Sequence, residues 1–240
     1  AARLLQFQSI DAFHSFYPME VIATRAEAEA LLKAFESADY LVFPENREFP
    51  VRMTRDLPQR WIERGVQDTL RGSADRGEYF AFQAGVWAAR RGIEDLAVRF
   101  SGLRDRNGTV AIPATAFTCF NLEGVDWKGH AFKKACPVSS GRVQALWMGV
   151  QIPAEAESGA YSGEMVIAPR GMTETRIKIE IDVSEKVLAD AGDGDPARLS
   201  RLRWLNSRTA LDDGLVKPFT ALTVSGDTIG CLGREVKLSP

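Results

Sequence analysis

The alternation of apolar and polar residues predicts a chain built mainly of β-strands. Between residues 176 and 183, isoleucines and a valine at odd positions alternate strictly with charged residues at even positions. One face of this strand therefore belongs to a core and the other to solvent. Residues 78–88, 96–100 and 146–152 show the same period. Short strands separated by turn residues are typical of an antiparallel β-sandwich of the immunoglobulin-like or jelly-roll type.

One helix is predicted near the N-terminal end. Thr24 and Glu27 form a capping box, in which the hydroxyl accepts from a helical N–H and the carboxylate reaches back to the cap. Residues 25–35 that follow are rich in Ala, Glu, Leu and Lys, which favour a helix. The apolar pieces after this helix are interrupted by prolines such as Pro44, which cannot donate to a central β-ladder.

The same patterns predict the domain organisation. We expect residues 1–187 to form an N-terminal β-sandwich domain, of which residues 1–65 are irregular and helical. The Asp- and Gly-rich stretch 188–198 is expected to be a linker. Residues 199–240 are expected to begin a second β domain that is truncated here, because their three short apolar stretches cannot enclose a core.

Composition narrows the function classes. The 240 residues include 45% hydrophobic and 26% charged residues with a formal net charge of −2, which is a soluble globular profile without the basic surface that nucleic-acid binding needs. No apolar run reaches the ~18 residues of a membrane span. Only two histidines are present, and neither lies at ligand spacing from a cysteine, so we predict no metal site and no cofactor.

The three cysteines leave two alternatives. Cys119 and Cys136 could form a disulfide in an oxidising compartment, which would leave Cys231 free. Alternatively, all three are buried thiols.

Several segments resemble bacterial glycoside hydrolase domain-containing proteins related to glycoside hydrolase family 123. They follow one another along nearly the whole chain: FHSFYPMEVIA (13–23), FPVRM (49–53), LPQRWI (57–62), GEYFAFQAGVWA (77–88), SGAYSGEMVI (158–167), SRLRWLNS (200–207) and LGREVKL (232–238). The resemblance implies a secreted or periplasmic protein whose N-terminal β-sandwich region precedes a catalytic (β/α)₈ barrel. It also implies that an adjacent Asp-Glu pair in the barrel hydrolyses N-acetylhexosaminides with help from the substrate's acetamido group.

This chain departs from that pattern because it contains neither an Asp-Glu dipeptide nor the alternating strand-helix pattern of a barrel. We therefore expect it to be the non-catalytic front part of a glycoside hydrolase. Its partner would be the downstream catalytic domain, which it supports and positions. The alternative is an autonomous carbohydrate-binding module whose partner is a glycan.

Four aromatic residues are candidates for carbohydrate binding, because sugar faces stack on aromatic rings. Trp127 lies in a predicted loop, where binding residues are common. Tyr79, Trp87 and Trp147 lie on the strand faces opposite the predicted core. Either these three meet a glycan, or the N-terminal segment or a neighbouring domain covers them.

Other residues favour structural roles. Tyr161 follows a turn, as in the tyrosine corner of immunoglobulin-like sandwiches, where the hydroxyl bonds back to the backbone. Arg201, Arg203 and Trp204 follow the expected linker, and we predict that they form a seam between domains. Further arginines, among them Arg47 and Arg60, are expected to bind carboxylates and carbonyls at internal seams.

Three polar groups are interpreted as structural rather than functional. The aspartates at 190, 193 and 195 lack the spacing and terminal Glu of a calcium loop, and a linker with capping aspartates explains them. Asp212 and Asp213 are interpreted as turn residues. His14, Ser15 and Glu20 lack the strand-turn-helix context of a hydrolytic triad.

Overall fold

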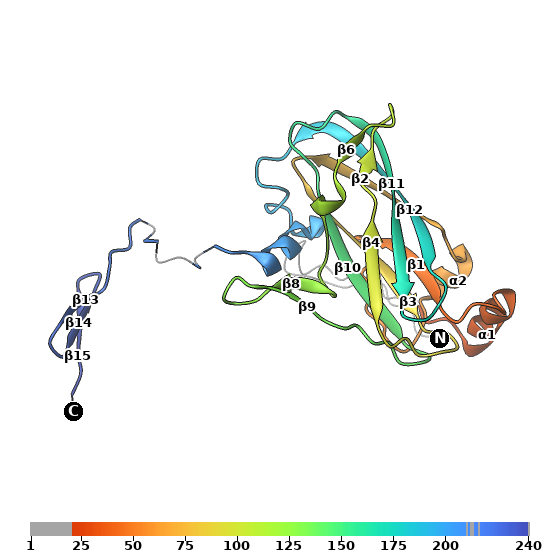
Figure 1. Cartoon of the computed structure of the whole chain (residues 1–240), viewed down its shortest axis with the longest axis horizontal. Coiled ribbons are helices and arrows are strands. Elements are labelled where there is room, and N and C mark those ends of the chain that lie inside the picture. The colour runs from red at the N-terminus through yellow and green to blue at the C-terminus, as the bar shows by residue number, and fades with distance from the viewer. Residues whose placement is uncertain (1–20, 210, 212–213, 216, 240) are drawn as a thin grey trace, which may run out of the picture.

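Two β-sheets pack face to face in the computed structural model, and a helical layer covers the outer face of one of them (Figure 1). The structure describes residues 21–209, 211, 214–215 and 217–239. The fold is mainly β and is a sandwich, as the alternation predicts. In the described part of the chain, no helix is long and apolar enough to cross a membrane.

The four-stranded sheet has the order β1–β3–β10–β7, and all its neighbours are antiparallel. Its strands are β1 (Leu41–Asn46), β3 (Tyr79–Trp87), β7 (Phe117–Cys119) and β10 (Val143–Gln151). Pro44 lies in β1, at the edge of the sheet. Its missing N–H therefore costs no hydrogen bond in a central ladder.

The six-stranded sheet has the order β2–β12–β11–β5–β6, and β4 also pairs with β11. Its strands are β2 (Thr69–Arg76), β4 (Leu96–Phe100), β5 (Leu103–Arg104), β6 (Val110–Ile112), β11 (Gly159–Pro169) and β12 (Thr175–Val187). The 3₁₀ turn η1 (Ala114–Ala116) leads from β6 to β7 in the other sheet. The pair β12–β2 is parallel, which strand alternation could not predict because it carries no information about the direction of a partner.

The main core lies between the two sheets. Its members come from the apolar faces that the sequence predicts: alternate residues of β3 (Phe80 to Val86) and then Ala88, of β10 and then Ile152, and of β12 (Ile177 to Val183). In β3, however, all nine residues are buried. The four-stranded sheet is therefore covered on both faces, whereas β12 alternates between buried and exposed positions.

The helical layer explains the burial of the second face of β3. It contains α1 (Arg25–Ala34), which begins at the predicted capping box, and a second, short helix α2 (Gln59–Arg64). The Trp61 indole stacks on Phe43, with ring centroids 4.2 Å apart. Any side chain at Gly85 of β3 would overlap the Trp61 ring, since an added Cβ lies 2.2 Å from it. The glycine thus lets α2 pack directly on the sheet.

A short hairpin and two 3₁₀ helices lie at the opposite side of the sandwich from α1 and α2 (Figure 1). The hairpin consists of β8 (Glu123–Val125) and β9 (Ala131–Lys133), and the helices are η2 (Pro196–Arg198) and η3 (Ser200–Asn206). η3 contacts β3, β8 and β10. The chain that follows β12 therefore packs against the sandwich again through η3 before it continues to the C-terminal residues.

The last described strands form a separate three-stranded antiparallel sheet, here called the C-terminal sheet. It consists of β13 (Thr223–Ser225), β14 (Thr228–Cys231) and β15 (Arg234–Lys237). These strands coincide with the predicted start of a second β unit. The domain boundaries at residues 187 and 198 remain a prediction.

Candidate functional site

The residues after β12 are fixed to the sandwich by a buried ion cluster, here called the exit clamp. Its centre is Glu78, whose side chain is fully buried directly before β3. The carboxylate accepts from Arg47 and, at 2.5 Å, from Arg198 of η2. Arg198 also donates to Asp75 at 2.8 Å. The clamp therefore joins the residue after β1 and the residue before β3 to β2 and η2.

The electrostatic environment of the exit clamp favours the charged forms of Asp75 and Arg198. Burial alone would raise the pKa of Asp75, but a hydrogen bond from Ser184 and the Arg198 guanidinium outweigh it and lower the pKa. Burial likewise opposes the charge on Arg198, and the carboxylates of Glu78 and Asp75 outweigh it, so its pKa is raised. Opposite charges at such distances stabilise each other strongly once water is excluded.

The aspartate-rich stretch before the clamp is a folded turn. Asp190 accepts from the backbone N–H groups of Gly192 and Gly194, and these bonds lower its pKa. Asp195 caps η2 by accepting from the N–H of Ala197 at 3.0 Å. The expected capping role is confirmed for Asp195, whereas Asp190 closes the turn before it. Over the described residues, no group of three His, Cys, Asp or Glu side chains could hold a metal ion.

Asp193 organises the start of η3. Its carboxylate accepts from Arg203 and from the Trp204 indole N–H at 3.1 Å, and its carbonyl accepts from Arg201 at 3.0 Å. The Ser200 hydroxyl donates to the Tyr79 carbonyl at 2.9 Å. The three residues of the predicted seam thus share one partner and lie beside the sandwich. Their role between two domains remains a prediction.

Trp204 is more open than a residue buried in a seam would be. It is 51% exposed, and the Arg201 guanidinium lies over its ring at 5.2 Å. Replacing a fully buried Trp by Ala typically lowers the free energy of unfolding by about 3–5 kcal/mol. That figure does not apply to Trp204, because half of its surface is exposed.

Exposed apolar side chains gather around η3 and the β8–β9 hairpin. We call this group the end surface; its members are Trp127, Phe132, Trp204, Leu205 and Leu211. Trp127 lies at the tip of the hairpin and is 81% exposed. The hairpin is attached to η3 because the N–H of Val125 donates to the Asn206 side chain at 3.1 Å. A Cβ added at Gly124 would lie 3.0 Å from both Asn206 and the Phe132 ring, so these groups are packed together.

The other three predicted aromatics do not form an open platform with Trp127. Trp87 is buried in the second core cluster with Leu31, Phe43 and Trp61. Tyr79 is buried, with its ring centroid 6.2 Å from that of Phe120, and burial raises its pKa to about 12. Trp147 is half-buried. The N-terminal layer therefore covers Trp87, which was one of the two alternatives that the sequence left open.

Tyr161 lies at a corner before the middle of β11. The residue is 3% exposed, and its hydroxyl donates to the Glu157 carbonyl four residues upstream at 2.8 Å. Burial raises the pKa of its phenol. The energetic importance of this hydrogen bond remains a prediction.

Arg47 and Arg60 do bind carboxylates, as expected: Arg47 binds Glu78, and Arg60 binds the buried Glu45 at 2.8 Å.

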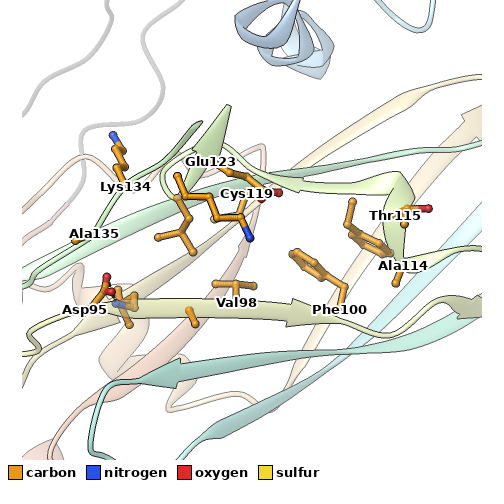
Figure 2. A pocket seen from close by; sticks show the side chains of 14 residues that line it. Asp95, Val98, Phe100, Ala114, Thr115, Cys119, Glu123, Lys134 and Ala135 are labelled. Carbon is orange, nitrogen blue, oxygen red and sulfur yellow. Dashed lines mark hydrogen bonds between the residues drawn. The ribbon is translucent and has the colours of Figure 1, made fainter. Parts of the chain in front are cut away.

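A groove of about 700 Å³ runs between the edge strands β4 and β7 (Figure 2). Phe100 and Phe117 stack in it with centroids 4.5 Å apart, and Val98 lies beside them. Lys134 and Glu123 lie toward one side. Its volume suits a small ligand, and its two phenylalanine rings stack on each other.

The cysteines are thiols in this structure. Cys119 and Cys136 are buried, and burial raises the pKa of Cys119 to about 12. Cys231 is exposed, which corrects the alternative of three buried thiols.

Five polar residues interpreted from the sequence lie outside the described residues: His14, Ser15, Glu20, Asp212 and Asp213.

Glu78 and Arg198, which form the exit clamp, were not predicted from the sequence. One signal for Glu78 was available, because a carboxylate directly before a continuously apolar strand needs a partner when it is buried. Arg198 gave no such signal. Its partners are 120 and 123 residues away in the sequence.

Together these features define a β-sandwich to which the residues after β12 are bound by ion pairs and hydrogen bonds. An exposed aromatic surface lies beside these residues. No protein-family model matches the chain, and no curated protein matches it. Three solved structures illustrate its similarities. One is a family 123 glycoside hydrolase from Clostridium perfringens studied for glycolipid glycan hydrolysis, with 14% identity over 62% of this chain and 28% of that chain and a TM-score of 0.49.

The second is the PapD-like domain 7 of human CEP192, with 12% identity over 75% of this chain and 99% of that chain and a TM-score of 0.35. The third is the N-terminal domain of PorA, with 11% identity over 60% and 97% of the two chains and a TM-score of 0.35. At these identities and TM-scores, none of the three supports an argument about function.

Proposed function

We propose that this chain is a non-catalytic β-sandwich module that holds and orients a following domain of the same polypeptide. The exit clamp carries this proposal. Domains joined by a plain linker move relative to each other by default. Here the chain is instead held to the sandwich from Ala191 to Asn206 by the ion pairs of Arg198 and the bonds of Ala191, Ser200 and Asn206.

The glycan-degrading character of the whole polypeptide is part of the same proposal and rests on the sequence resemblance. The resembling segments fall on the structural elements that matter here. Residues 57–62 include the start of α2, residues 77–88 contain Glu78 and β3, and residues 200–207 contain η3. The proposed parent enzyme is a secreted or periplasmic hydrolase acting on N-acetylhexosaminides through a downstream (β/α)₈ barrel.

The test compares the full encoded polypeptide with residues 1–240 on aryl N-acetylhexosaminides. We expect hydrolysis by the full polypeptide and none by residues 1–240. In the full polypeptide, Arg198→Gln should lower kcat/KM because the following domain is held less firmly. Arg170→Gln, which removes an exposed contact with Asp95 at 3.4 Å, should have no effect. Hydrolysis by residues 1–240, or a natural polypeptide without a further domain, would overturn the proposal.

The second candidate is an autonomous carbohydrate-binding module, and the exposure of Trp127 favours it. Aromatic rings open to solvent provide stacking area with little loss of conformational entropy. Calorimetric titration of residues 1–240 with N-acetylglucosamine oligosaccharides separates the two candidates. Binding that is lost in Trp127→Ala at unchanged thermal stability would favour this module.

A further inference from the structure

The C-terminal sheet has one apolar and one polar face. Its register aligns Val224 with Ile229 and Ile229 with Val236, so these three side chains form a row across the strands. Cys231 shares their face by alternation, and Leu222 and Leu238 continue it at the ends. The opposite face carries Thr223, Ser225, Thr228, Gly230, Glu235 and Lys237, and Arg234, opposite Cys231 on the edge strand, is the one charged strand residue on the apolar face. Apart from Arg234, this alternation is typical of a sheet with one buried face.

That apolar face is open in the structure. Val224 is 72% and Val236 59% exposed, and Leu222 and Leu238 are exposed as well. Among the described residues, none forms a second layer over it. A three-stranded sheet of this size needs such a layer for stability, so the face requires an occupant.

The end surface of the sandwich offers matching chemistry. It presents the aromatic and aliphatic side chains defined above, among them Trp127 of the hairpin and Leu205 of η3. Both surfaces belong to one chain and are connected by residues 207–222. Leu211 of this connection lies beside the hairpin, because a Cβ added at Gly129 would lie 2.8 Å from it.

The connection makes an intramolecular contact the favoured one. Sixteen residues, 207 to 222, span up to about 50 Å when extended, and joining two surfaces on one chain by a short stretch raises their effective concentration to about the millimolar range. A second copy is a poorer occupant. The apolar face has about six side chains, whereas stable protein interfaces involve about 20–30 residues on each side.

We propose that the end surface is the docking site of the C-terminal sheet of the same chain, which packs with its Val224–Ile229–Val236 face against Trp127 and its neighbours. This inference deepens the positioning role proposed above, since docking would orient whatever follows the C-terminal sheet. It assigns Trp127 to a protein interface rather than to a glycan.

Paramagnetic broadening tests the contact in residues 1–240. A nitroxide attached at Lys237→Cys lies on the polar face of β15, and a Cys231→Ala background removes the exposed thiol while keeping the other face apolar. The buried Cys119 and Cys136 should not react. We expect loss of amide signal intensity in the β8–β9 hairpin and in η3, relative to a diamagnetic label. Val224→Ser with Val236→Ser, and separately Trp127→Ala, should restore the signals, whereas Val187→Ser at the exposed end of β12 should not.

Absence of broadening in the parent, or broadening that persists in both interface variants, would overturn the proposal. Broadening that grows with protein concentration would assign the face to a second copy and would overturn it too. Hydrolysis by the full polypeptide is measured separately, so docking can fail while the proposed function stands.

Discussion

Side chains of the same type have different roles in this protein, and the difference lies in what surrounds each residue. Trp61 and Trp87 are buried in the second core cluster, whereas Trp127 is open to solvent. Glu78 and Glu45 are buried but paired with two arginines each. An unpaired carboxylate at either position would carry a large desolvation penalty.

At this scale, Tyr161→Phe tests whether the corner hydroxyl stabilises the sandwich. The variant keeps the ring and removes one donor to the Glu157 carbonyl. We expect a loss of about 1 kcal/mol in the free energy of unfolding, which corresponds to roughly 2–4 °C in Tm for a chain of this size. Ser140→Ala, which removes an exposed hydroxyl that donates to Arg90 at 3.2 Å, should change Tm little. Equal Tm values for Tyr161→Phe and the parent would contradict the corner role.

At the scale of elements, short segments without a core of their own are held by polar contacts to the sandwich. η2 and η3 are 3₁₀ helices, whose hydrogen-bond geometry gives them little independent stability. They are held by Arg198, Ser200 and Asn206. α2, in contrast, is held by the stacking of Trp61 on Phe43 and by the bond from the indole N–H to Glu45 at 2.8 Å.

Arg198→Ala should detach η2 and destabilise the sandwich as well. The buried Glu78 keeps Arg47 as an ion-pair partner and loses one charged hydrogen bond, and a hydrogen bond to a charged group typically contributes about 1.5–3 kcal/mol. The matched control is Arg99→Ala, which breaks an exposed 2.6 Å pair with Glu174 and should cost under about 1 kcal/mol. Urea unfolding measures both. If the two variants lost similar stability, the clamp would not hold the chain exit.

At the scale of the whole molecule, the clamp bears on where the first domain ends. β12 ends at Val187, but the contacts of Arg198, Ser200 and Asn206 to the sandwich lie beyond it. The domain boundary predicted from composition places a linker at 188–198. The structure shows ordered turns and η2 in that stretch.

Two truncations test the boundary. We expect residues 1–206 to unfold close to the midpoint of residues 1–240, because the clamp is intact. Residues 1–187 should be less stable by about 3 kcal/mol or more, since Glu78 loses Arg198 and the Tyr79 carbonyl loses Ser200. Denaturant midpoints of the three chains provide the comparison. A chain of residues 1–187 as stable as residues 1–206 would place the boundary at the end of β12, as composition predicts.

The sequence by itself determined the sandwich class, the faces of β3, β10 and β12 that point into the main core, and the start of α1 at Thr24. These features depend on the period of the backbone and on hydrogen bonds between residues three apart, so they can be read from a short window of sequence. Only the tertiary structure decided that Trp87 is covered and Trp127 is open, that β2 pairs in parallel with β12, and that Arg198 reaches Glu78. Each of these depends on which distant segments meet, and local periodicity carries no information about that.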